Sequence, residues 1–321
     1  MNAFLGEPGK RFAERWLALL LLPGALFVAA AAVAGALGQR RALDTGGLAA
    51  WVDRLAAAQQ GGRSGGAVLV VAAAPAAAAA AGLGAAALGF FIERLWTAEG
   101  RSGPLRPLAR MRRRRWQRAH EQVRVWRTAV LVSAAPPDGA DPLARAGLRD
   151  ALARCARISL VVADRPTWIG DRLRAADVRL HHAYRVDLGA WWPALWLAAP
   201  DSTRAELTQA YAAYRASARL MAWGLLYLAL GGWWWPAALI AAATLATAQV
   251  RARATASALA ELVEAAVDLH GREVAGLLGV EPGGSLDART GRRVSALLRK
   301  DELATFDPVA LDSVPEQQQR S

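Results

Sequence analysis

The sequence is poor in the side chains that build redox, metal and catalytic sites. Its 321 residues include one cysteine, Cys155, four histidines and two lysines, Lys10 and Lys300. A single cysteine excludes a disulfide framework and any metal site with several cysteines, and the dispersed histidines do not replace one. Glycine-rich phosphate loops, the Gly-x-Ser-x-Gly turn and helical metal-ligand motifs are also missing. We therefore expect no enzyme, no bound metal and no cofactor.

Negative charge is scarce as well. The chain has 27 Asp and Glu against 39 Lys and Arg, for a formal net charge of +12, and 54% of its residues are hydrophobic. This apolar content excludes a disordered chain and leaves ample material for a core or for membrane spans. A GC-rich genome would by itself generate an abundance of alanine and arginine, so neither residue type alone indicates a function.

Three segments contain no charged residue and are long enough to cross a bilayer: 16–38, 67–92 and 220–250. Each exceeds the roughly 18 residues typical of a span. The first is longer than the apolar core of a signal peptide, so we expect a retained anchor rather than a cleaved leader. The second is mostly Ala and Gly, so its insertion is marginal and requires a partner helix. Together they predict a transmembrane hairpin over 16–92 with an outer loop at 39–66.

The third segment is interrupted near its middle by Gly231, Gly232 and Pro236. Two glycines followed by a proline predict a chain reversal, and consecutive tryptophans favour the headgroup layer of a membrane. We therefore predict a second transmembrane hairpin over 220–250, with one long tilted helix as the alternative. The expected interface anchors are Trp233, Trp234 and Trp235.

Arginines near the ends of these segments predict their orientation, because cytoplasmic flanks carry the excess of positive charge. Arg54 and Arg63 precede the second segment, whereas Arg94, Arg101, Arg106 and Arg110 follow it, and Arg215, Arg219, Arg251 and Arg253 flank the second hairpin. The sequence thus predicts an all-α membrane protein with four transmembrane helices in two hairpins and a helical cytoplasmic domain. Residues 1–15, 93–219, 251–303 and the polar tail 304–321 would lie in the cytoplasm of a bacterial inner (plasma) membrane.

The most basic segment, residues 109–120, surrounds a tryptophan with arginines. Such patches occur in nucleic-acid-binding surfaces, where guanidinium groups neutralise phosphates and aromatic rings stack on bases. This one follows soon after a predicted span, where arginines determine topology and bind anionic lipid. We expect the lipid or topology role, with a protein partner and nucleic acid as alternatives, for Arg110, Arg112, Arg113, Arg114, Arg115 and Trp116.

The segments outside the spans are predominantly helical in pattern. Asp141-Pro142 predicts a helix start that places Cys155 on a buried face, where a reactive thiol is not expected. A capping box at Thr203–Glu206 predicts another start, and a long amphipathic helix follows the second hairpin, with His270 on its apolar face. A shorter helix is expected over 292–303. Residues 158–162 favour a strand but have no evident partner.

The predicted spans contain no ionisable residue, so the usual marker of a proton or ion relay is missing. The second span instead carries small residues, which let helices approach closely and favour a bundle or an oligomer. The residues expected at this packing surface are Gly82, Gly84 and Gly89. A pore lined by backbone and apolar side chains would need no charge.

Two further elements occur between residues 164 and 196: Pro166-Thr-Trp-Ile-Gly-Asp171 and Tyr184-Arg-Val-Asp187, the latter followed by Trp191-Trp-Pro-Ala-Leu-Trp196. They resemble a signature of an uncharacterised family of bacterial polytopic membrane proteins, in which P-T-x-x-G-[ND] precedes Y-x-[IL]-D and W-P-x-L. The resemblance covers about residues 160–270 and implies a cytoplasmic helix followed by a membrane hairpin, with no known activity. Pro166-Thr167 also predicts a helix start independently, which favours a structural role for the motif.

Two hairpins separated by a long helical segment also resemble the layout of bestrophin-type anion channels, although the channel and calcium motifs of that family are absent. Our first hypothesis is therefore an oligomeric, channel-like inner-membrane protein with a cytoplasmic gating or coupling domain. The alternative is a non-conducting membrane anchor that binds a soluble protein. Expected partners are anionic lipid, further copies of the chain and a soluble protein, but not nucleic acid.

Overall fold

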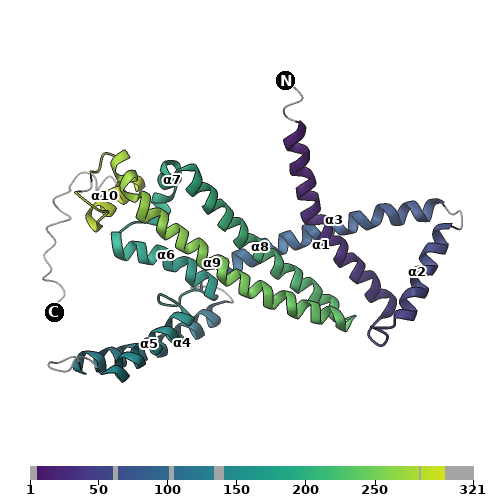
Figure 1. The fold of residues 1–321 in the computed structure, drawn as a ribbon, viewed down its shortest axis with the longest axis horizontal. Helices are drawn as coiled ribbons and strands as arrows, with labels where there is room; N and C mark the ends of the chain where they lie inside the picture. Colours follow the sequence, from purple (N-terminus) through teal and green to yellow (C-terminus); the bar gives the residue numbers. More distant parts are fainter. Residues whose placement is uncertain (1–5, 61–63, 101–104, 134–140, 282, 301–321) are drawn as a thin grey trace. The chain divides into compact units, whose positions relative to one another are not determined.

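The computed structural model describes residues 6–60, 64–100, 105–133, 141–281 and 283–300, and across them the chain forms ten helices and no strand. The all-α prediction is confirmed, and residues 158–162 form no strand. Arg63, Arg101 and the tail 304–321 lie outside the described residues. The helices, labelled in Figure 1, are α1 (Gly6–Leu37), α2 (Thr45–Gln60), α3 (Ser64–Thr97), α4 (Arg106–Ser133), α5 (Pro142–Ile158), α6 (Trp168–Tyr184), α7 (Leu188–Ala198), α8 (Asp201–Gly231), α9 (Trp235–Leu277) and α10 (Ala288–Arg299).

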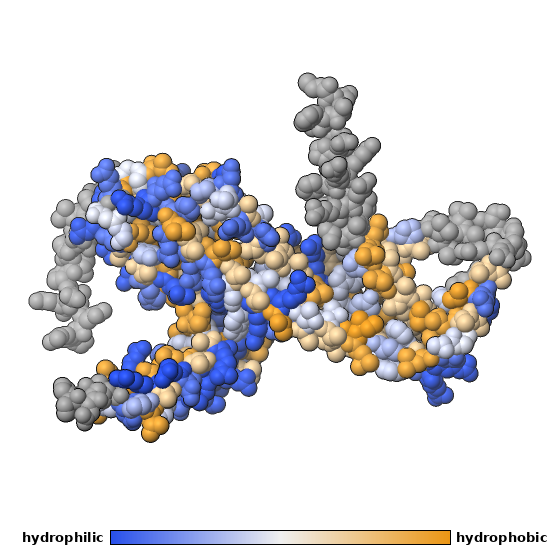
Figure 2. All heavy atoms as spheres, in the orientation of Figure 1, coloured by the Kyte–Doolittle hydropathy of each residue, from blue (hydrophilic) through white to orange (hydrophobic). Residues whose placement is uncertain are grey.

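The chain divides into two units. Unit 1 comprises Met1–Leu95 and Arg215–Ala252, and unit 2 comprises Trp96–Tyr214 and Arg253–Ser321. Helices α8 and α9 each contribute residues to both units. Apolar residues are frequent on the visible surface of unit 1 (Figure 2). In this unit Leu26, Leu83 and Phe91 are at least 60% exposed.

Small residues determine how the helices of unit 1 pack. A Cβ on Gly24 of α1 would collide with the carbonyl oxygen of Ala78 in α3, so the two backbones touch where they cross. A Cβ on Gly89 of α3 would lie 3.1 Å from the Arg219 side chain of α8. These contacts are the close approaches that small residues permit between helices.

The reversal predicted at the tryptophan run is confirmed. Helix α8 ends at Gly231 and α9 begins at Trp235, so the alternative of one continuous helix is wrong. Gln39 holds the turn, because its amide nitrogen donates to the Gly232 carbonyl at 2.8 Å and its amide oxygen accepts from the Trp235 backbone N–H at 3.2 Å. The Trp234 indole N–H donates to the Ala42 carbonyl at 3.0 Å.

Within the described part of the chain, one helix is long and apolar enough to cross a membrane, over Ala73–Thr97 of α3, and Leu21–Leu37 of α1 is a shorter apolar helix. Only 28% of the α3 window is buried, so most of its surface has no protein cover. This finding supports membrane association, whereas four spans are not confirmed. The turn between α8 and α9 explains part of the difference between the four predicted spans and the one observed. It divides residues 220–250 into two apolar pieces, each shorter than the roughly 18 residues of a typical span.

In unit 2, α4 and α5 form a helical hairpin with a small core. The core consists of Val123, Ala151 and Cys155, with Trp126 packed against it. Asp141 caps α5 as predicted, since its carboxylate accepts from the Leu143 backbone N–H. Cys155 is buried as expected, and its burial raises the pKa of the thiol, which disfavours the reactive thiolate.

The second part of unit 2 surrounds Trp191, which is fully buried in α7 and packs with side chains of α6, α9 and α10. Two predicted helix boundaries differ from the structure. Helix α8 begins at Asp201, which places Thr203 inside the first turn rather than at the cap, and α10 begins at Ala288, capped by Asp287, rather than at residue 292. Residues that can cap a helix are frequent in this sequence, so the local pattern alone does not identify the residue at which each helix begins.

Candidate functional site

The most enclosed polar group of unit 2 is the carboxylate of Asp171, in the first turn of α6, which is fully buried. One of its oxygens accepts from the backbone N–H groups of Asp164 and Arg165, at 3.0 and 2.9 Å. The other accepts from the Arg112 guanidinium at 2.8 Å. Burial raises the pKa of Asp171, and the hydrogen bond from Arg112 opposes that shift by stabilising the charged form.

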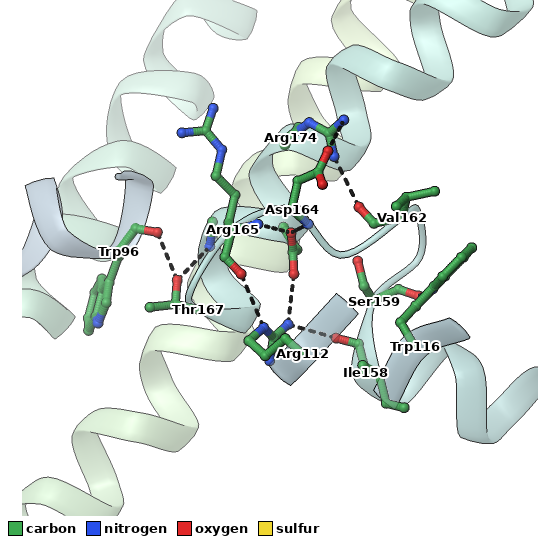
Figure 3. Close-up of polar contacts among 12 residues, drawn as sticks. Trp96, Arg112, Trp116, Ile158, Ser159, Val162, Asp164, Arg165, Thr167 and Arg174 are labelled. Atoms are coloured by element: carbon green, nitrogen blue, oxygen red, sulfur yellow. Dashed lines mark hydrogen bonds and ion pairs between the residues drawn. The ribbon is translucent and has the colours of Figure 1, made fainter. Parts of the chain in front are cut away.

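Arg112 links this carboxylate to two further segments (Figure 3). Its guanidinium also donates to the carbonyls of Ile158, at the end of α5, and Arg165, in the loop before α6, at 2.9 and 3.3 Å. One arginine of α4 therefore joins the end of α5, the following loop and the start of α6. An ion pair whose arginine also donates to two backbone carbonyls is a structural arrangement, and removing one partner leaves an uncompensated charge.

The Pro166–Asp171 motif has a structural explanation. Thr167 caps α6, because its hydroxyl accepts from the Gly170 backbone N–H at 3.0 Å and donates to the Trp96 carbonyl at 2.7 Å (Figure 3). A Cβ on Gly170 would collide with that same carbonyl. Together with the bonds of Asp171, these contacts engage the Thr167 hydroxyl and the Asp171 carboxylate within the protein, which agrees with a structural role.

Charge pairs also join α6 to α9. Arg172 of α6, whose side chain is 5% exposed, pairs with Glu261 at 3.1 Å and Glu264 at 3.4 Å. Glu264 also pairs with Arg179 at 3.0 Å. Each of these carboxylates faces an arginine, so the cluster is a network of ion pairs between the two helices.

The Tyr184–Asp187 element forms the corner between α6 and α7, and α10 packs on it. Arg185 adopts a left-handed conformation (φ 56°) as it ends α6, and Asp187 caps α7. The Ser295 hydroxyl of α10 accepts from the Asp187 backbone N–H at 3.1 Å and from the Trp191 indole N–H at 2.9 Å. A Cβ on Gly291 would collide with the Tyr184 carbonyl, so α10 lies directly against the corner.

Unit 2 also contains an open apolar groove of about 1070 Å³. Helices α6, α7, α8 and α9 all contribute to it, and Asp177 adds a carboxylate. Such a surface is suited to an apolar segment or ligand. The large side chains that line the groove include Leu173, Trp192, Trp196, Leu207, Tyr211 and Val263.

The structure divides the predicted arginine segment into two groups. Arg112 and Arg113 pair with Asp171 and Asp164, and the Trp116 indole N–H donates to the Ser159 carbonyl at 3.1 Å. These three side chains make bonds within the protein, and their role toward lipid or in topology stays a prediction. The remaining predicted arginines, Arg110, Arg114 and Arg115, line a shallow pocket of about 450 Å³ with Arg118.

The other predicted site residues also fall into distinct environments. Gly82 is buried, Gly89 lies against Arg219, and Gly84 has no neighbour for an added Cβ within 4 Å. Of the three tryptophans, Trp233 and Trp235 are 72% and 43% exposed, whereas Trp234 bonds to Ala42. The role of these residues in helix association and at a membrane interface stays a prediction.

His270, expected on a buried apolar face, is half-buried and has polar neighbours. Its Nε2 lies 3.4 Å from the Thr203 hydroxyl, and its Nδ1 lies 3.7 Å from Glu273. The described residues contain no group of three or more His, Cys, Asp or Glu arranged to hold a metal ion. Sequence reasoning missed the roles of Ser295 and Arg112. Their partners Asp171, Asp187 and Trp191 lie in the two elements that the sequence analysis singled out, so these elements were the available signal.

No family model matches the chain, and comparison with curated proteins and with solved structures gives no match either.

Proposed function

We propose that the chain is a four-span protein of a bacterial inner membrane whose unit 2 lies in the cytoplasm and gates or couples to a pore formed by several copies. The observation that carries this proposal is the continuity of α8 and α9, which span 31 and 43 residues and each belong to both units. A continuous helix transmits a displacement along its length, so a change in unit 2 can reach the segment at residues 220–250.

The uncovered surface of α3 supports assembly into an oligomer. Leu83, Gly84 and Phe91 are exposed there, and an added Cβ at Gly84 meets open space. In a membrane this surface faces lipid or another helix, and the small residues favour a helix.

Topology tests the four-span arrangement. In a Cys155→Ala background, an impermeant thiol reagent should label Val52→Cys, on exposed α2, from outside the cell. Ser285→Cys, in the exposed loop before α10, should be labelled only after the membrane is opened. Labelling of Ser285→Cys from outside intact cells would contradict the arrangement.

Conduction is tested with the full chain in liposomes. We expect potassium or chloride flux above that of empty liposomes, recorded with a potential-sensitive dye. Gly84→Leu should reduce the flux, whereas Gly35→Leu, at another open glycine on α1, should not. The absence of flux from correctly inserted protein would reject the pore.

The groove of unit 2 favours a second candidate function, a non-conducting anchor that binds an apolar segment of a soluble protein. Trp192 and Trp196 supply the large aromatic surface that dominates such contacts. A partner that is captured by the full chain and lost on Trp196→Ala, combined with absent flux, would favour this alternative.

A further inference from the structure

Helix α4 has two unlike faces. Arg112 and Trp116 point toward α5, α6 and the loop between them, as their bonds to Ile158, Asp171 and Ser159 show. Arg110, Arg114 and Arg118 follow one another at intervals of four residues and are therefore neighbours on a single face. All three are exposed, and no ion pair joins them to another described residue.

Apolar side chains share this outer face. Met111, Val125 and Val132 are 46%, 59% and 73% exposed, and their positions differ from Arg118 by multiples of seven, which places all four on one side of the helix. A face that combines unpaired arginines with exposed apolar residues has the composition of helices that lie in a membrane interface.

The position of Trp116 indicates whether the outer face of α4 suits lipid or nucleic acid. Binding of single-stranded nucleic acid uses aromatic rings on which bases stack. The only aromatic residue of the 109–120 segment other than histidine instead stacks on His120, at 4.6 Å between ring centroids, and bonds to Ser159. The outer face thus has cations and apolar groups without a stacking platform.

We propose that the outer face of α4 binds the phosphate headgroups of anionic lipid through Arg110, Arg114, Arg115 and Arg118, while Met111 contacts the acyl boundary. This inference rests on the proposed membrane location, and it names the lipid-binding residues of that location. The arginines line the same shallow pocket, so several guanidinium groups converge on one surface. Arginine forks match phosphate oxygens in geometry as well as in charge.

The test uses the full chain in nanodiscs, with an environment-sensitive dye on Gln117→Cys in a Cys155→Ala background. Gln117 is exposed and adjoins the arginine face. The dye emission should shift to the blue in phosphatidylglycerol discs and not in phosphatidylcholine discs. Arg110→Gln, Arg114→Gln and Arg118→Gln together should abolish the blue shift. Each basic residue contributes roughly 1 kcal/mol near an anionic surface, so the three changes lower the lipid-binding equilibrium constant about 100-fold.

The matched control removes the same charge from α5, with Arg145→Gln, Arg149→Gln and Arg154→Gln, and should leave the response unchanged. An equal loss in this control would mean that net charge, not the α4 face, is responsible, and would overturn the proposal. Three other results would also overturn the proposal. They are an unshifted dye in phosphatidylglycerol discs, a shift produced by inorganic phosphate alone, and RNA binding that replaces lipid binding. Carbonate extraction of the chain from membranes would instead reject the proposed function itself.

Discussion

Single side chains in unit 2 hold several segments together at once. Asp171 accepts hydrogen bonds from two backbone groups and one guanidinium, and the Ser295 hydroxyl accepts from both Asp187 and Trp191. Each is buried, so no water replaces a lost partner, and an unpaired buried polar group is costly. Substitutions at such positions should therefore affect stability far more than substitutions of exposed charges.

Asp171→Asn should destabilise the protein by about 3 kcal/mol, because it leaves the guanidinium of Arg112 without its counter-ion in a largely buried place. Thermal unfolding in detergent, followed by tryptophan fluorescence, measures the effect. Combining it with Arg112→Gln should cost less than the sum of the two single changes.

Glu121→Gln removes the exposed pair with Arg124 and should cost at most about 0.5 kcal/mol. Equal losses from Asp171→Asn and Glu121→Gln would contradict this interpretation.

Gly291→Ala should displace α10, because its Cβ would collide with the Tyr184 carbonyl at the α6–α7 corner. We expect a loss of about 1–3 kcal/mol, typical of added volume where no space exists. Gly276→Ala on α9 is the control, since an added Cβ there meets nothing within 4 Å and alanine favours a helix. Faster hydrogen exchange in α10 for the first variant only is the expected result.

At the scale of whole helices, α4 illustrates why a run of like residues is not one functional unit. The helix turns by about 100° per residue, so consecutive arginines face different surroundings. Arg112 enters a buried ion pair while Arg110 and Arg114 stay exposed. The arginines of this run therefore have different roles, which depend on the face of α4 that each one occupies.

Helix α10 should loosen in acid, because its cap depends on an ionised carboxylate. Hydrogen bonds from Thr290 hold the pKa of Asp287 below its ordinary value, so folding favours the charged form. That stabilisation is present above the unfolded pKa of about 3.9 and is lost as the pH falls through the lower folded pKa. Amide protection factors of α10 should fall over that acid range. In Asp287→Asn this pH dependence should be absent.

For the whole molecule, assembly depends on which glycines face another helix of the same chain. Gly89 approaches Arg219 of α8, whereas Gly84 has open space around it. Gly89→Leu should therefore destabilise unit 1 itself. Gly84→Leu should leave the single chain folded.

We expect Gly84→Leu to dissociate the proposed oligomer in native mass spectrometry, while Gly35→Leu leaves it intact. The added leucine preserves hydrophobicity and blocks close helix approach, which is the contact that small residues provide. A parent chain that is a stable monomer in lipid discs would remove the oligomer and the pore that depends on it.

Local features of this protein were determined by the sequence itself. The helix starts at Asp141 and Thr167 and the reversal between Gly231 and Trp235 depend on capping groups and helix breakers, which act over a few residues. The capping box predicts a start of α8 at Thr203, whereas the helix begins at Asp201, because several residues near this start can serve as caps.

Only the tertiary structure decided which polar groups meet. Arg112 and Asp171 are 59 residues apart and Trp191 and Ser295 are 104 apart, and no periodic pattern connects such positions. The division of the arginine segment, the groove of unit 2 and the open space at Gly84 follow from the packing of distant helices. The residue pattern determines which face of a helix is apolar, but only the packing of the whole chain determines which other helix covers that face.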